Sequence, residues 1–122
     1  MTVWNRLGAN RDERLARAGD LASGKVVEAG GVGDLLARII EPGDRVCLEG
    51  NNQKQADFLA KALARLDPAA VHDLHIVQSV LAIPEHLDVF ERGIASRLDF
   101  SFSGPQGARL ARLLADGRIR LG

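Results

Sequence analysis

Three neighbouring residues, Gly50, Asn51 and Asn52, have the types and spacing that can hold an anion or a reaction oxyanion. They lie between an apolar stretch with strand character and a helical pattern. Such a loop gathers unpaired backbone N–H groups, a partial positive helix dipole and two side-chain amides in one place. The same residue types also form ordinary turns between a strand and a helix, and on spacing alone that ordinary turn is favoured.

The elements on either side of this loop follow from residue patterns. Pro42 and Gly43 predict a type II turn, because proline presets φ at the second turn position and glycine accepts a positive φ at the third. Residues 45–49 then predict a short interior strand with charges only at its ends. Residues 54–66 predict a helix, which a capping box of Asn52 and Gln55 would open.

Two further strand and helix units follow along the chain. Residues 74–82 are β-branched and apolar, which predicts a buried parallel strand, and residues 84–91 predict a brief helix. Residues 98–103 alternate between apolar and polar, which predicts another strand. A helix to about residue 115 comes next, with Ser103 and Gln106 as its capping box, and a last strand begins near residue 118.

Three loops are predicted to meet at one edge of this sheet, because ligands of open α/β sheets bind beyond the carboxyl ends of the strands. The loops are residues 50–53, 78–84 and 101–106. Besides the oxyanion candidates, their candidates for binding a substrate or thioester are Gln53, Gln78, Ser79, Ser101, Ser103 and Gly104.

The order of elements predicts an α/β fold with an open, mostly parallel sheet and flanking helices. Residues 32–40 add a packed helix, and residues 25–27 a short edge strand. We expect residues 25–122 to form the α/β domain. Residues 1–24 are expected to be an amino-terminal arm, in which Asn10 and Glu13 cap a short charged helix.

Composition excludes several classes of protein. The 122 residues carry 16 basic and 16 acidic side chains, so no non-specific nucleic-acid or membrane surface is predicted. Only five residues are Trp or Phe, too few for a row of rings that stacks single-stranded bases. A single cysteine and the lack of a long apolar run predict a cytoplasmic protein without disulfides or membrane spans.

Other residues suggest chemistry that their context does not support. Glu28 begins an E-x-G-x-x-G pattern, and a carboxylate in such a setting can attack a thioester, but no clear strand precedes it. Cys47 lies in the middle of a strand, where a thiol is expected to be core rather than a nucleophile.

The three histidines are expected to be ordinary surface residues. His72 and His75 would not share a strand face and no ligand cluster completes a metal set, so no metal site is predicted. His86 is expected on a short exposed helix beside Glu85.

Four stretches together resemble the α subunit of bacterial malonate decarboxylases. They are GDRVCLEGNNQKQADFL at residues 43–59, HDLHIVQSV at 72–80, PEHLDVFE at 84–91 and DFSFSGPQ at 99–106. The resemblance runs from about residue 25 to the end of the chain, and covers only the amino-terminal part of that much longer subunit. It implies a CoA-transferase-like fold.

The resemblance implies a transferase that exchanges acetyl for malonate on an acyl carrier protein, giving malonyl-carrier and acetate. The thiol that carries the acyl group would belong to the phosphoribosyl-dephospho-CoA arm of that carrier protein. The partners would be the carrier protein and the other malonate decarboxylase subunits. By this resemblance Gly50, Asn51 and Asn52 would shape the oxyanion site, although related enzymes have Gly-Gly-Phe there. The catalytic glutamate of the related enzymes lies in the carboxyl-terminal half, so Glu28 is not its counterpart.

Two functions of other classes stay open on the residues alone. One is a small-ligand or nucleotide-binding module that uses the same loop, and the other is a domain that docks partner subunits. Even as part of such a transferase, the 122 residues alone are expected to lack transferase activity, because they offer oxyanion donors without a positioned nucleophile or a second substrate pocket.

Overall fold

The protein is built around a four-stranded, fully parallel sheet. In the computed structural model, which describes residues 3–50 and 56–122, the strands follow one another in the order β3 (Arg45–Leu48), β4 (Leu74–Val80), β5 (Ala95–Phe102) and β6 (Arg120–Leu121). Three helices connect successive strands: α3 (Asp57–Ala64), α4 (Glu85–Glu91) and α5 (Gly107–Ala115), the last preceded by the 3-10 turn η2 (Gly104–Gln106). The predicted open, parallel α/β fold is confirmed.

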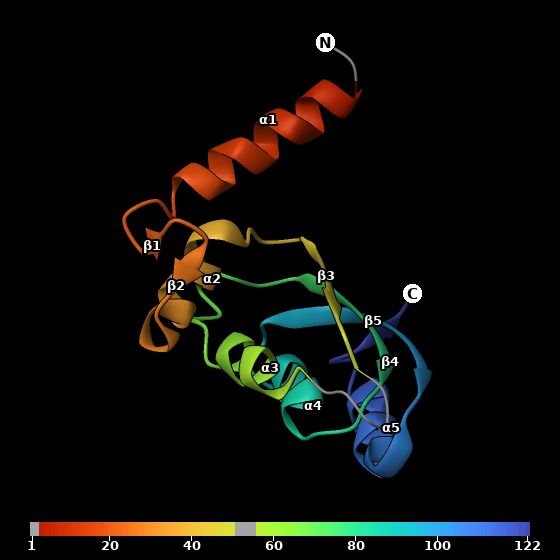
Figure 1. The fold of residues 1–122 in the computed structure, drawn as a ribbon. Coiled ribbons are helices and arrows are strands. Elements are labelled where there is room, and N and C mark those ends of the chain that lie inside the picture. The colour runs from red at the N-terminus through yellow and green to blue at the C-terminus, as the bar shows by residue number, and fades with distance from the viewer. Residues whose placement is uncertain (1–2, 51–55) are drawn as a thin grey trace.

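All three connecting helices lie on the same side of the sheet (Figure 1). Side chains alternate between the two faces of a strand, so every second residue of the sheet points into this helix layer. Ile76 and Leu98 are fully buried there against Leu63 of α3 and Leu87 of α4. This layer holds the hydrophobic core and fixes the orientation of the sheet.

The opposite face of the sheet, here called the open face, is not covered by α3, α4 or α5 (Figure 1). Its side chains come from strand positions in register across the sheet, such as Cys47, Val77 and Asp99. Cys47 is exposed, so the prediction that it belongs to the core is wrong. The prediction of an interior strand at residues 45–49 is also wrong, because β3 lies at one edge of the described sheet.

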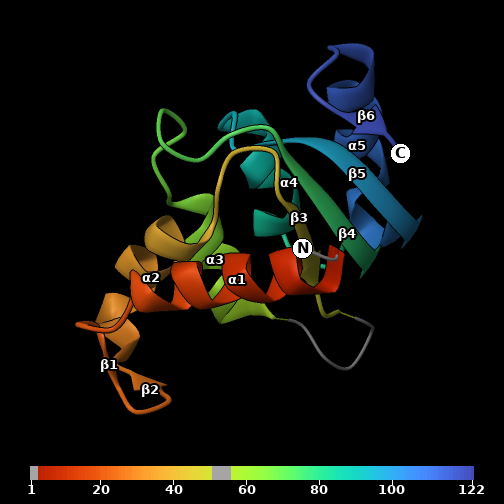
Figure 2. The same cartoon turned by 90° about the horizontal axis from the view of Figure 1, so that it is seen from above.

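The amino-terminal part begins with α1 (Val3–Ala16), which projects from the body of the molecule on the side away from α3, α4 and α5 (Figure 1) and crosses in front of α2 and α3 when seen from above (Figure 2). A two-stranded antiparallel hairpin, β1 (Ala22–Ser23) and β2 (Val26–Val27), follows. The chain then forms η1 (Ala29–Gly31) and α2 (Val32–Ile39) before it enters β3. Among the described residues, none of the helices combines the length and the hydrophobicity that a membrane span requires.

Helix starts differ from the predicted ones. Asn10 lies inside α1 instead of capping a helix, and Ser103 makes no side-chain capping hydrogen bond. The helix predicted from residue 54 begins at Asp57, after Ala56, and the proposed cap of Asn52 and Gln55 lies outside the described residues.

The turn before β3 is confirmed. Gly43 has a φ of 83°, and the Asp44 N–H donates to the Glu41 carbonyl over 3.1 Å, which closes the predicted turn.

Candidate functional site

A shallow hollow of about 470 Å³ lies where β3, β4 and β5 reach their carboxyl ends. Its lining comes from three neighbouring strands and consists of Cys47, Leu48, Glu49, Gly50, Val77, Gln78, Ser79, Asp99, Phe100 and Ser101. We call it the strand-end hollow. Four predicted site residues, Gly50, Gln78, Ser79 and Ser101, therefore come together at the edge of the sheet where ligands of this fold class bind.

The floor of the hollow is a row of residues in register on the open face. Cys47, Val77 and Asp99 lie side by side on β3, β4 and β5, with adjacent strands about 4.8 Å apart. Ser79 and Ser101 follow two positions later on their strands and are exposed. Hydroxyls in this position can donate to or accept from a polar ligand that lies across the strand ends.

A backbone hydrogen bond holds the start of α3 at the hollow. The Ala56 N–H donates to the Glu49 carbonyl over 3.2 Å, which brings the start of α3 back to the end of β3. Gly50 lies between them, is buried and makes a single β-bridge. Asn51, Asn52 and Gln53 lie outside the described residues.

Gln78 lines the hollow, but its side chain is buried on the helix side of the sheet, where it contacts α4. Only 3% of Gln78 is exposed, and its Nε2 lies 2.8 Å from Nδ1 of His86 in α4. His86 is fully buried, so the prediction of an ordinary histidine on an exposed helix is wrong. This contact ties β4 to α4, the helix that follows it.

The hydrogen bonds of His86 indicate its protonation state. Its Nδ1 accepts the backbone N–H of Ala82 over 3.1 Å, so the proton of the neutral ring belongs on Nε2. Burial lowers the pKa of His86, and the nearby Glu85 carboxylate opposes this shift only in part. A neutral His86 therefore holds the loop between β4 and α4 at the rim of the hollow.

A second histidine, His75, lies beside the floor of the hollow, two positions before Val77 on the same face of β4. His75 is 7% exposed, and its Nε2 is 3.0 Å from Oδ2 of Asp99 without the alignment of a hydrogen bond. The prediction of a surface histidine is therefore wrong for His75. His72 fits that prediction better, because its half-exposed ring pairs locally with Asp73.

The remaining predicted candidates lie at or beyond the rim. Ser103 and Gly104 do not line the hollow. Gly104 has a φ of 56°, and a Cβ added there would lie 3.7 Å from the Leu81 carbonyl oxygen. Gly104 therefore allows the chain to turn after β5, and this turn lies next to the residues that follow β4. Glu28 is exposed just before η1 and contributes nothing to the hollow.

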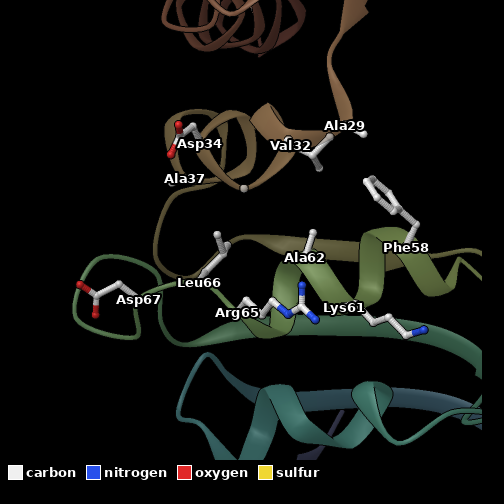
Figure 3. Close-up of a pocket in the computed structure, with 12 residues that line it drawn as sticks. Ala29, Val32, Asp34, Ala37, Phe58, Lys61, Ala62, Arg65, Leu66 and Asp67 are labelled. Atoms are coloured by element: carbon white, nitrogen blue, oxygen red, sulfur yellow. The ribbon is translucent and has the colours of Figure 1, made fainter.

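A larger groove of about 560 Å³ lies between α2 and α3 (Figure 3). Phe58 points into it from α3 towards Ala29 and Val32. It contains none of the predicted site residues and lies away from the strand ends. The strand-end hollow is the better candidate site although the groove has the larger volume, because open α/β sheets bind their ligands at the carboxyl ends of the strands.

Sequence patterns contained signals for the residues that the prediction missed. The alternation in β3 already places Cys47 opposite Val46 and Leu48, and the register of β5 places Asp99 on the same face as Cys47, with Val77 of β4 between them. The sequence analysis expects Cys47 in the core, whereas the structure leaves its face of the sheet open. Within residues 3–50 and 56–122, no group of three His, Cys, Asp or Glu side chains is placed to hold a metal ion.

Known proteins match this chain over nearly its whole length. The family model of the malonate decarboxylase alpha subunit matches residues 3–122. An acetyl-S-ACP:malonate ACP transferase of Malonomonas rubra is 46% identical over 121 residues, which cover 98% of this chain.

Two solved structures have the same fold with a TM-score of 0.95 each. One is a Pseudomonas malonate decarboxylase hetero-tetramer in complex with malonate, at 53% identity, and the other is a malonate decarboxylase alpha subunit from Acinetobacter baumannii, at 43% identity. Each match covers 98% of this chain. The chain spans only 22% of the length of each of these relatives.

Proposed function

This chain belongs to the malonate decarboxylase alpha subunit family, and from that premise we propose that it supplies the amino-terminal part of an acyl-carrier-protein transferase. The complete subunit would exchange acetyl for malonate on the carrier thiol, forming malonyl-S-carrier and releasing acetate. The observation that carries the proposal is the strand-end hollow, which gathers Gly50, Ser79 and Ser101 in a chain 46% identical to such a transferase.

In this role the hollow would hold the reacting thioester. Attack on the thioester carbonyl turns its oxygen into an oxyanion, which backbone N–H groups at a strand end and helix start can stabilise. Gly50 and its following loop are the proposed donors, since the bond from Ala56 N–H to the Glu49 carbonyl keeps both elements together. Ser79 and Ser101 would orient the acyl group through their hydroxyls.

The attacking group is proposed to come from the part of the subunit that this chain does not include. None of the titratable residues that line the hollow is held by a hydrogen-bonded base among the described residues, as an activated nucleophile would need. The substrate would reach the hollow on the phosphoribosyl-dephospho-CoA arm of the carrier protein. The other malonate decarboxylase subunits are its proposed partners, and the cytoplasm its proposed location.

A hybrid subunit tests this proposal. The matched amino-terminal part of the Malonomonas rubra transferase is replaced by this chain, and the hybrid is incubated with acetyl-S-carrier and malonate. We expect malonyl-S-carrier and acetate from the hybrid, and neither product from the 122 residues alone.

Two results would contradict the proposal. One is a folded hybrid that transfers nothing, which would favour a docking role. The other is tight mononucleotide binding by the chain without binding of CoA, measured by calorimetry, which would favour a nucleotide-binding module.

A further inference from the structure

The open face of the sheet carries a row of basic side chains beside the strand-end hollow. Arg45, His75, Arg97 and Arg120 are partners in register on β3, β4, β5 and β6. Side chains in register on neighbouring parallel strands point to the same face. With strands about 4.8 Å apart, the row extends over roughly 14 Å across the whole described sheet.

The three arginines of the row are exposed and lack acidic partners. Among residues 3–50 and 56–122, none of Arg45, Arg97 and Arg120 makes an ion pair, and Arg97 only donates to the Gly122 carbonyl over 3.1 Å. The Asp99 carboxylate on the same face lies 3.0 Å from His75. The row therefore presents three positive charges without matching negative charges from the described chain.

The surroundings of the row indicate a protein layer rather than solvent. Parallel sheets are normally covered on both faces, whereas α3, α4 and α5 cover only one face here (Figure 1). Half-buried Val77 and exposed Cys47 lie next to the row, which makes the face partly apolar. A small anion would contact one or two of these groups, while a segment laid across the strands would contact all of them.

Any segment that covers this face must bring negative charge. Burying an arginine without a partner costs several kcal/mol, so an apolar layer would be unstable there. More than three quarters of the length of the matched relatives lies outside the part that corresponds to this chain. The subunit itself therefore has ample chain to form such a layer.

We infer that a carboxylate-bearing segment of the same subunit, from outside the part that corresponds to this chain, packs on the open face and pairs with Arg45, Arg97 and Arg120. This inference rests on the family membership and the charge row, not on the transferase activity. The segment lies over the row and beside the strand-end hollow, so it closes one side of the hollow.

Carbodiimide coupling in the hybrid subunit tests the pairing. The reagent joins an amine directly to a neighbouring carboxylate, so an Arg97→Lys variant keeps the charge and makes position 97 reactive. We expect mass spectrometry to find position 97 joined to an Asp or Glu outside the 122 residues. Arg112→Lys, at an exposed site on α5, is the matched control and is expected not to give that link.

Alkylation of Cys47 provides a second readout on the same face, because its thiol is exposed in the described chain. In the native hybrid we expect iodoacetamide to modify Cys47 at least tenfold more slowly than in the urea-unfolded hybrid. An Arg97→Glu and Arg120→Glu double variant should restore fast labelling, and Arg112→Glu should not.

Three outcomes would overturn the inference. They are links from position 97 that stay within the 122 residues, labelling of Cys47 as fast in the native as in the unfolded hybrid, and links between the 122-residue parts of two copies. If the double variant does not fold, the coupling experiment with Arg97→Lys still tests the inference, because that variant keeps the positive charge that the pairing requires.

Discussion

A single buried ring, His86, connects the helix layer to the edge of the candidate site. Its Nδ1 faces the Gln78 side chain and the Ala82 N–H, and both can donate to it. A proton on Nδ1 would turn this acceptor into a donor and break the contact with the Ala82 N–H. The loop between β4 and α4 therefore depends on the charge state of one residue.

Acidification should weaken the fold through His86. Because burial lowers the pKa of His86 below its usual 6.5, the unfolded chain binds this proton more readily than the folded chain. The stabilising contribution is therefore fully present above about pH 6.5 and is lost as the pH falls below that value. Thermal melts between about pH 7.5 and 5.5 should show a falling transition temperature, and a His86→Gln variant should show a smaller pH dependence. An identical pH dependence in both proteins would contradict this account.

At Gly104, near the rim of the hollow, any side chain should destabilise the fold because of the backbone conformation. Gly104 has a φ of 56°, which costs other residues about 1–2 kcal/mol, although the added Cβ would only touch its neighbours. Gly104→Ala should lower the free energy of unfolding by about that amount in urea melts. Gly33→Ala is the control, since it lies in α2 with nothing within 4 Å of its Cβ position and should be neutral or stabilising. Equal effects of the two changes would count against the strain argument.

At the scale of elements, the amino-terminal helix is held by ionic contacts rather than by a buried stripe. Arg14 of α1 donates to Glu41 over 2.9 Å and to the Ile39 carbonyl over 3.2 Å, and it also pairs with Asp44. Burial alone would raise the pKa of Asp44, but the bonds from Arg14 and the Glu41 N–H lower it overall. These contacts fix α1 to the end of α2 and to the turn before β3.

Removing this anchor should free α1 without unfolding the sheet. Arg14 is only 21% exposed and is shared by several acceptors, so Arg14→Ala should lower stability by about 1–3 kcal/mol. Amide hydrogen exchange in α1 should become much faster, while exchange in β4 stays slow. Arg11→Ala, on the exposed side of the same helix, is the control and should leave both unchanged. Unchanged exchange of α1 in Arg14→Ala would show that another contact holds it.

The strand and helix pattern was predictable because it depends on local alternation and spacing. β4, α4 and the glycine stops after α4 and α5 follow the sequence closely, with positive φ at Gly93 and Gly117. Helix starts were less predictable, because tertiary contacts decide them: α1 runs through Asn10, and η2 begins beside Ser103 without its side chain. A capping pattern shows where a helix can start, and packing decides whether it does.

At the scale of the whole molecule, strand order and face coverage were beyond prediction. The sequence does not show that β3 is an edge strand or that one sheet face stays open, and for that reason the environment predicted for Cys47 is wrong. The meeting of Gly50, Ser79 and Ser101 was predictable, because parallel strands bring their carboxyl ends to one edge. The position of the candidate site could therefore be predicted from the parallel topology. The solvent exposure of its floor could not, because it depends on which face of the sheet is left uncovered.

If the strand-end hollow is part of the thioester cleft, as proposed, then filling it in the hybrid subunit should stop the transfer reaction. Ser79 is exposed on the central strand of the hollow, so Ser79→Trp places an indole in that space without disturbing the core. Ser23→Trp, exposed on the amino-terminal hairpin, is the matched control. The rate of malonyl-S-carrier formation should fall at least a hundredfold for Ser79→Trp and stay unchanged for Ser23→Trp, with equal melting temperatures. Full activity of a folded Ser79→Trp subunit would contradict the account.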